Sequence, residues 1–165
     1  MSKTLQDLKV AFAGESQANR RYLAYAKQAE KEGYPQIARL FRAVASAETV
    51  HAHNHFRVMG GVGSTEDNLK AAITGENYEV ATMYPEFIAD AEGEGEKKAL
   101  NSFTWAWEVE KEHEILFKQT METMGAALGD VEIWVCPVCG HTHLGVRPDR
   151  CPVCNTPGER FELVD

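Results

Sequence analysis

The sequence predicts a mainly α protein, a four-helix bundle followed by a small metal-binding domain. Two motifs of the form E-x-x-H, Glu48/His51 and Glu110/His113, lie in long segments with helical periodicity. Each of the other two helical segments contains a Gly-Glu pair, and two C-P-V-C motifs follow the last helix. This is the ligand pattern of a two-metal site inside a four-helix bundle. The helices are expected over residues 4–32, 35–59, 65–92 and 96–124.

Glycine, proline and capping residues set the expected helix boundaries. Gly33 suits the end of the first helix and Pro35 the start of the second, because glycine accepts a positive φ and proline needs no hydrogen-bond acceptor. The glycine-rich residues 60–63 end the second helix. Ser64 or Thr65 can cap the third helix, since either hydroxyl accepts a hydrogen bond from a free backbone N–H group.

The connection between the second and third helices leaves two topologies open. If these helices run parallel, residues 60–67 must cross about 24 Å, and eight extended residues reach roughly 27 Å. This length permits the long crossover of a ferritin-like bundle. A simple up-down-up-down bundle is the alternative.

An internal repeat predicts a local irregularity in the third helix. The segment that begins at Ala11 resembles the segment that begins at Ala72, but the third helix contains one extra residue relative to the first. A helix absorbs an extra residue as a π-bulge, which is common at functional sites. Pro85 lies in the same stretch and removes one helical donor. We therefore expect a bulge or kink between Glu76 and Ala91.

Seven side chains on these helices form a candidate two-metal site. Residues three apart on a helix share a face, so each E-x-x-H motif presents a carboxylate and an imidazole to one metal. Carboxylate oxygens with a few imidazoles suit iron or manganese better than copper. The matched spacing within a repeat favours this site over ordinary solvated ion pairs. The expected ligands are Glu15, Glu48, His51, Glu76, Glu79, Glu110 and His113.

The two C-P-V-C motifs predict a second, tetrahedral metal site. Eleven residues separate the pairs, and a four-thiolate site of this kind holds either zinc or a single iron. Gly140 and Asn155 follow the second cysteine of each pair, where a residue tolerant of positive φ is needed. His141 and His143 are not required, because four thiolates complete the coordination. The expected ligands are Cys136, Cys139, Cys151 and Cys154.

Length, charge and cysteine usage limit the class of protein. A chain of 165 residues suits one domain with a small appendage, and we expect domains 1–130 and 131–165 joined by a linker over 125–131. The net charge of −8 argues against binding to nucleic acid or to anionic membranes. The sequence shows neither a membrane-spanning apolar run nor a signal-peptide pattern, and its paired cysteines suit metal binding. A cytoplasmic protein is expected.

The whole chain resembles the rubrerythrin family, which joins a ferritin-like diiron bundle to a small rubredoxin-like domain of short strands and loops. The resemblance rests on AFAGESQA over residues 11–18, GExxE over 75–79 and Met-Tyr-Pro over 83–85, together with the E-x-x-H and C-P-V-C motifs. It implies a peroxidase that reduces hydrogen peroxide to water, with two irons in the bundle and one iron in the four-cysteine site. It also implies catalytic roles for Glu79 and His51, which exchange as ligands of one iron, and for Tyr22 and Tyr84.

The resemblance and the helix lengths also lead to expectations about the electron donor and the oligomeric state, and two other functions stay open. The resemblance implies an electron donor such as rubredoxin or an NAD(P)H-dependent reductase. His113 and Leu128 are about 22 Å apart along a helix, so a head-to-tail homodimer or higher homo-oligomer is expected to bring one chain's thiolate site to its partner's diiron site. The alternatives are an oxygen-using diiron ferroxidase or oxidase, and an iron-storage protein with a structural zinc ribbon.

Overall fold

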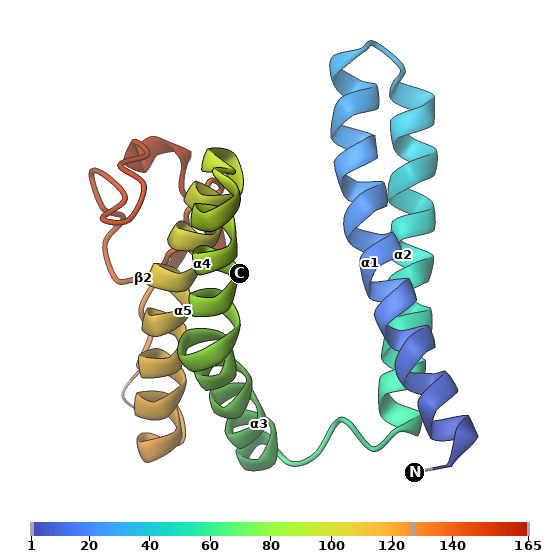
Figure 1. Cartoon of the computed structure of the whole chain (residues 1–165), viewed down its shortest axis with the longest axis horizontal. Helices are drawn as coiled ribbons and strands as arrows, with labels where there is room; N and C mark the ends of the chain where they lie inside the picture. The colour runs from blue at the N-terminus through green and yellow to red at the C-terminus, as the bar shows by residue number, and fades with distance from the viewer. Residues whose placement is uncertain (1, 127, 165) are drawn as a thin grey trace. The chain divides into compact units, whose positions relative to one another are not determined.

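The computed structural model describes residues 2–126 and 128–164, which form two compact units, Met1–Gly63 and Ser64–Asp165. In the first unit, α1 (Lys3–Lys31) and α2 (Pro35–Val58) form an antiparallel hairpin (Figure 1). The N-terminus of α1 is capped by Ser2, whose hydroxyl accepts a hydrogen bond from the N–H of Leu5 at 3.2 Å. Pro35 begins α2, as the sequence predicts.

Small residues allow α1 and α2 to approach closely. The buried side chains of this interface are mostly alanines, which leave little space between the two backbones. Asn19 is the buried polar exception among the described residues of the unit. Its amide nitrogen donates to the carbonyl of Ala45 at 2.7 Å and to the hydroxyl of Thr49 at 2.9 Å. The buried alanines are Ala26, Ala29, Ala38, Ala45 and Ala52.

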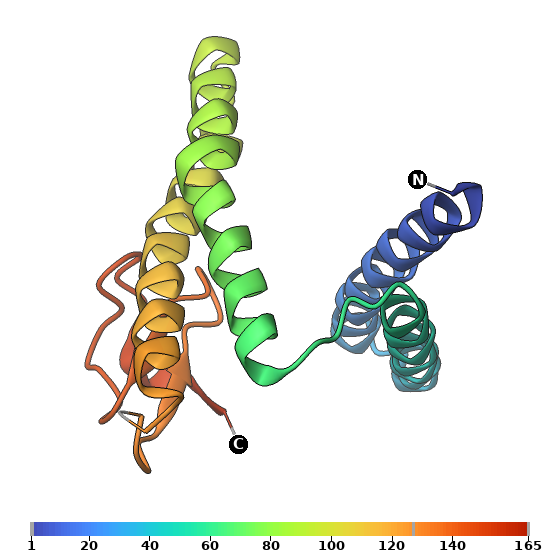
Figure 2. The same ribbon diagram turned by 90° about the horizontal axis from the view of Figure 1, so that it is seen from below.

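The second unit contains a second antiparallel helical pair. Its first arm is a continuous rod formed by three segments, and α5 packs along it (Figure 2). Ser64 caps the rod by accepting a hydrogen bond from the N–H of Asp67 at 3.1 Å. Gly95 ends the rod with a φ of 73°. The segments are α3 (Thr65–Tyr78), η1 (Glu79–Met83), α4 (Tyr84–Glu94) and α5 (Lys97–Thr123).

The segment η1 is π-helical, which confirms the predicted bulge. The N–H of Tyr84 donates to the carbonyl of Glu79, five residues back, so the carbonyl of Val80 has lost its α-helical donor. In the π-helical register that carbonyl would accept from residue 85, but Pro85 has no N–H. The indole N–H of Trp107 on α5 donates to it instead, at 2.9 Å.

The C-terminal residues form a small sheet that returns to α5. The strands are antiparallel in the order β2-β1-β3, and β2 contacts α5. Gly158 lies so close to the carbonyl of Pro148 that a Cβ atom there would be 1.8 Å from the oxygen. Ala127, within the expected linker, lies outside the described residues. The elements are β1 (Ile133–Val135), β2 (Thr142–Leu144), η2 (Gly158–Arg160) and β3 (Glu162–Val164).

The predicted helices are confirmed to within two residues at each end. The boundary between residues 130 and 131 stays a prediction, because the described contacts divide the chain at Gly63 instead. Among the described residues, none of the helices combines the length and the apolar character that a membrane crossing requires.

Replacing Trp107 tests the role of its indole N–H. We expect Trp107→Phe to lower the free energy of unfolding by about 1–3 kcal/mol, because the carbonyl of Val80 loses its donor while the aromatic ring is retained. Guanidinium denaturation followed by circular dichroism measures this change. Trp105→Phe is the matched control, since Trp105 lies on the same helix and is 37% exposed. Equal losses in the two variants would contradict the assignment.

Candidate metal centres

The first unit brings together one group of candidate ligands. Glu15 on α1 and Glu48 and His51 on α2 each offer a ligand atom within 4.8 Å of the others. The Nδ1 atom of His51 lies 2.9 Å from a carboxylate oxygen of Glu48. Hydrogen bonds with Glu15 and with His51 lower the pKa of Glu48. The E-x-x-H motif therefore presents both side chains to one point, as its helical spacing predicts.

The second unit contains a matching group. Glu76 on α3 and Glu110 and His113 on α5 also lie within 4.8 Å of one another. The Nδ1 atom of His113 lies 2.7 Å from a carboxylate oxygen of Glu110, in the same arrangement as His51 and Glu48. The internal repeat of the sequence is thus a repeat of ligand geometry.

Three ionisable side chains lie close together in this second group. Burial, a hydrogen bond with Glu110 and repulsion from its charge raise the pKa of Glu76 to about 7. The hydrogen bond with His113 lowers the pKa of Glu110, and the same bond raises the pKa of His113. Carboxylates this close on two helices need a proton or a cation between them, so the donor set fits a hard metal ion.

Glu79 and Tyr84 lie beside the second group. Glu79 is outside the set within 4.8 Å, but burial and the charge of Glu110 raise its pKa. Burial and the charge of Glu79 raise the pKa of Tyr84, so its hydroxyl keeps its proton near neutral pH. Its ring packs against Phe87 and Phe103, with centroids 6.3 and 6.5 Å away.

Tyr22 has a different setting. It packs in a ring cluster with Tyr25 and Phe41, at centroid distances of 6.3 and 6.1 Å. It lies seven residues after Glu15, or about 10 Å along the helix axis. The structure therefore places Tyr84, but not Tyr22, next to a ligand group within its own unit.

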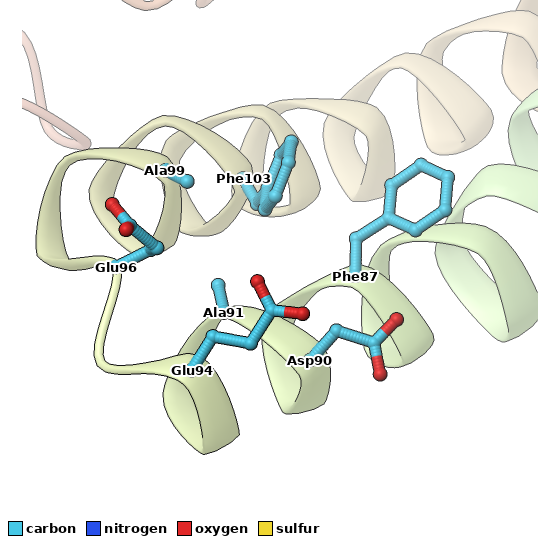
Figure 3. A pocket seen from close by; sticks show the side chains of 7 residues that line it. All are labelled: Phe87, Asp90, Ala91, Glu94, Glu96, Ala99 and Phe103. Carbon is cyan, nitrogen blue, oxygen red and sulfur yellow. The ribbon is translucent and has the colours of Figure 1, made fainter.

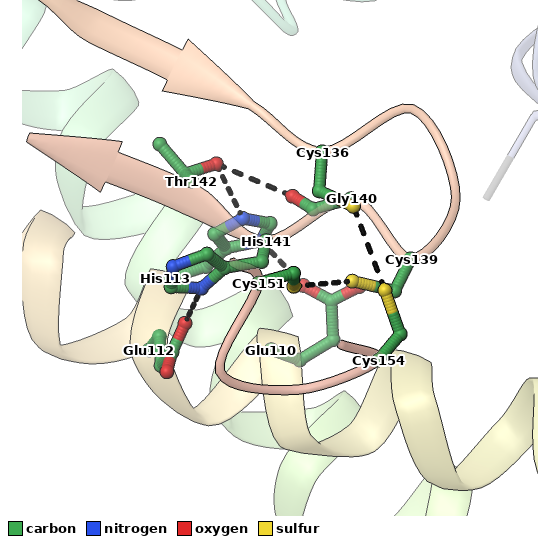
Figure 4. A network of polar contacts seen from close by, with 10 residues as sticks. All are labelled: Glu110, Glu112, His113, Cys136, Cys139, Gly140, His141, Thr142, Cys151 and Cys154. Carbon is green, nitrogen blue, oxygen red and sulfur yellow. Dashed lines mark hydrogen bonds and ion pairs between the residues drawn. The ribbon is translucent and has the colours of Figure 1, made fainter. Parts of the chain in front are cut away.

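The four cysteines converge as predicted. Their sulfur atoms form one group within 4.8 Å, and none of them is in a disulfide. The Sγ atoms of Cys136 and Cys154 are 3.6 Å apart, and those of Cys139 and Cys151 are 3.5 Å apart (Figure 4). A tetrahedron with metal–sulfur bonds of about 2.3 Å has edges of about 3.8 Å, so the site fits one tetrahedral metal.

Two backbone knuckles shape this site. The N–H of Gly140 donates to the carbonyl of Cys136 at 2.9 Å, and the N–H of Asn155 donates to that of Cys151 at 3.0 Å. Gly140 and Asn155 have φ values of 86° and 62°, which confirms the expected left-handed conformation. Backbone N–H groups then point at the sulfur atoms, an arrangement that tunes the potential of a bound iron.

Burial and hydrogen bonds shift the pKa values of the thiols in opposite directions. Burial raises the pKa of Cys139, and the backbone N–H of His141 opposes this by donating to its sulfur. For Cys154, burial also acts to raise the pKa, but hydrogen bonds from Thr156 and contacts with the other cysteines lower it to about 7. A metal that favours thiolates is expected to complete the deprotonation.

Residues 140–142, hereafter the cysteine loop, follow Cys139 and contact α5, the helix that contains His113. The hydroxyl of Thr142 lies 3.0 Å from Nε2 of His113 and 3.4 Å from the carbonyl of Gly140 (Figure 4). Beside this contact, Nδ1 of the buried His141 pairs with the carboxylate of Glu112. The chain turns back after α5, so the distance of about 22 Å along the helix axis is not the separation of the two sites. Within one chain the cysteine loop already reaches a candidate diiron ligand, so helix length does not require a partner subunit to supply it.

A separate pocket lies where α4 turns into α5. It has a volume of about 370 Å³, and its lining includes Asp90, Glu94 and Glu96 together with Phe87 and Phe103 (Figure 3). The described lining residues include neither histidine nor cysteine. The acidic side chains lie at an exposed helix junction, and the candidate metal-ligand groups of the described residues lie elsewhere.

Comparison with known families agrees with this geometry. Residues 7–121 match a family model described as rubrerythrin. The chain belongs to the rubrerythrin family. Residues 134–162 match a second model, described as the rubredoxin-like domain of rubrerythrin. The two predicted kinds of metal site therefore correspond to the two matched segments.

Relatives align over nearly the whole chain. Rubrerythrin-2 of Clostridium acetobutylicum is 38% identical over 96% of this chain and 95% of its own length. Nigerythrin of Nitratidesulfovibrio vulgaris is 35% identical over 98% of this chain and 86% of its own. Solved structures of nigerythrin, in a partially reduced and in a fully reduced, all-ferrous state, have TM-scores of 0.60 at 35% identity, covering 99% of this chain and 88% of theirs. The predicted fold class is confirmed.

Sequence reasoning missed the residues that connect these groups. Thr142, Glu112 and Trp107 belong to no recognisable motif. The sequence predicts no role for His141, because four thiolates complete the coordination of the metal. Their positions beside Gly140, His113 and the π-helical segment become meaningful only when distant elements pack together.

Metal binding to the second group is expected to depend on pH. With a pKa of about 7, Glu76 is protonated below neutral pH, and a metal must displace that proton. The affinity for Co²⁺ should therefore rise between about pH 6 and about pH 8. Absorbance titrations of protein whose four-cysteine site is filled with zinc measure this slope. Glu76→Gln should bind more weakly with a shallower slope; an unchanged slope would exclude Glu76 as its source.

Proposed function

We propose that this protein reduces hydrogen peroxide to water at a diiron centre, and that a single iron held by the four cysteines returns the electrons. The observation that supports this most strongly is the contact of the cysteine loop with His113 through Thr142. This contact brings the four-cysteine segment to a candidate diiron ligand, which favours electron transfer between the two sites. Family membership supports the same conclusion.

We assign the iron ligands from the two carboxylate–histidine groups and the cysteine cluster. When bound there, two ferrous ions would supply the two electrons that cleave one O–O bond, and two protons would complete the conversion of hydrogen peroxide to two water molecules. The carboxylates balance the charge of the ions, and Glu79 is the additional carboxylate. The proposed diiron ligands are Glu15, Glu48, His51, Glu76, Glu79, Glu110 and His113, and the proposed single-iron ligands are Cys136, Cys139, Cys151 and Cys154.

Glu79 and Tyr84 have proposed roles beyond ligation. Glu79 lies three residues after Glu76 on the same helical face, and the charge of Glu110 raises its pKa. We propose that it would exchange with His51 as a ligand when bound irons change oxidation state. Burial and the neighbouring carboxylates raise the pKa of Tyr84, so we propose that its hydroxyl keeps its proton and would deliver it to a departing oxygen. Tyr22 is the weaker candidate, because its contacts are with Tyr25 and Phe41.

The proposal also includes the setting of the reaction. The electrons come from a donor such as rubredoxin or an NAD(P)H-dependent reductase, and the working form is a homodimer or higher homo-oligomer. Reduced C-x-x-C pairs suit the cytoplasm, where such a protein would defend against oxidative stress.

Peroxide and oxygen distinguish the proposed function from its alternatives. The anaerobically reduced, iron-loaded protein is mixed with each oxidant while the visible thiolate-to-iron bands are followed. We expect the bands to return rapidly with hydrogen peroxide and slowly with oxygen. A faster return with oxygen would indicate an oxidase or ferroxidase. Absence of these bands in every state would indicate zinc in the cysteine site and would overturn the electron-transfer role.

Replacing Tyr84 tests its role as a proton donor. We expect Tyr84→Phe to slow the return of the bands with peroxide by about 10²-fold, since general acid catalysis contributes at least this much in typical enzymes. Tyr25→Phe should leave the rate unchanged, because its ring is 48% exposed in the other aromatic cluster. A normal rate for Tyr84→Phe, with iron content unaltered, would exclude the role.

A further inference from the structure

The contact between His113 and Thr142 has a defined direction. A threonine hydroxyl has one proton, and the carbonyl of Gly140, 3.4 Å away, is an acceptor that requires it. The hydroxyl oxygen is then left to accept a hydrogen bond from Nε2–H of His113 at 3.0 Å. Nδ1 faces Glu110 and donates to it without a metal; a metal that binds Nδ1 would displace that proton and leave the proton on Nε2.

A second contact holds Thr142 in place. The adjacent residue, His141, is 5% exposed, and its Nδ1 pairs with Glu112, the residue before His113. Thus two consecutive residues of the cysteine loop contact two consecutive residues of α5. Pairing of Thr142 with Val135 in the sheet fixes the strand from its other side.

We infer that Thr142 is a positioning residue, whose hydroxyl oxygen holds the Nε2 proton and the ring orientation of His113, so that Nδ1 is the nitrogen presented to a metal. The four-cysteine domain thus supports a ligand of the diiron centre from the same chain. Groups that orient a metal-bound histidine through its other nitrogen are worth about 10–100-fold in metal affinity. The inference rests on the proposed assignment of His113 as a ligand.

The full-length chain with zinc in its four-cysteine site provides the test. Co²⁺ affinity is measured by absorbance titration, and ¹⁵N chemical shifts of protein with Zn²⁺ at every site report the tautomer of metal-bound His113. We expect Thr142→Val to weaken Co²⁺ binding by about 10–100-fold and to mix the tautomers, and Thr142→Ser to restore both. Thr142→Ala repeats the test should valine disturb the strand. Thr74→Val, at an exposed threonine of α3, is the matched control and should change neither.

His113→Gln separates the inference from the assignment beneath it. Loss of Co²⁺ binding in His113→Gln, together with normal affinity and a single Nε2–H tautomer in both Thr142→Val and Thr142→Ala, would overturn the role of Thr142 alone. Unchanged binding in His113→Gln would overturn the ligand assignment and the inference with it.

Discussion

The crowding of carboxylates between neighbouring helices is the constraint on which the rest of this structure depends. Glu76 and Glu110 share a hydrogen bond and repel each other when both are ionised, and burial adds to the cost. His113 relieves part of this repulsion from its position three residues beyond Glu110. A bound cation removes the rest, so the acidic interior is itself an argument for metal.

The π-helical segment serves the same group. One extra residue rotates the helix that follows Glu79, and Tyr84 lies in this rotated part, beside the carboxylates. Such a segment leaves a carbonyl without its helical donor, and Pro85 removes the nearest substitute. The indole of Trp107 supplies the missing hydrogen bond from α5. The irregularity is therefore stabilised by the helix that provides Glu110 and His113.

Three consecutive residues of the cysteine loop serve two metal sites. Gly140 permits the turn that directs backbone N–H groups at the sulfur atoms, and the N–H of His141 donates to Cys139. The side chains of His141 and Thr142 point the other way, to Glu112 and His113. A sheet and a turn fix this short segment, so only a few bonds separate the cysteine cluster from His113.

The sequence by itself determined what depends on local geometry. Helical spacing of three places Glu110 and His113 on one face, an added residue in a repeat requires a bulge, and Gly140 and Asn155 satisfy the knuckles. Only the tertiary structure decided how the tail returns to α5 and which donor pairs with Val80. Such contacts join residues far apart in the chain, and they depend on the packing of whole elements, which no local pattern encodes. The expected separation of about 22 Å was therefore wrong as a distance between sites, because α5 ends at Thr123 and the chain then turns back along it.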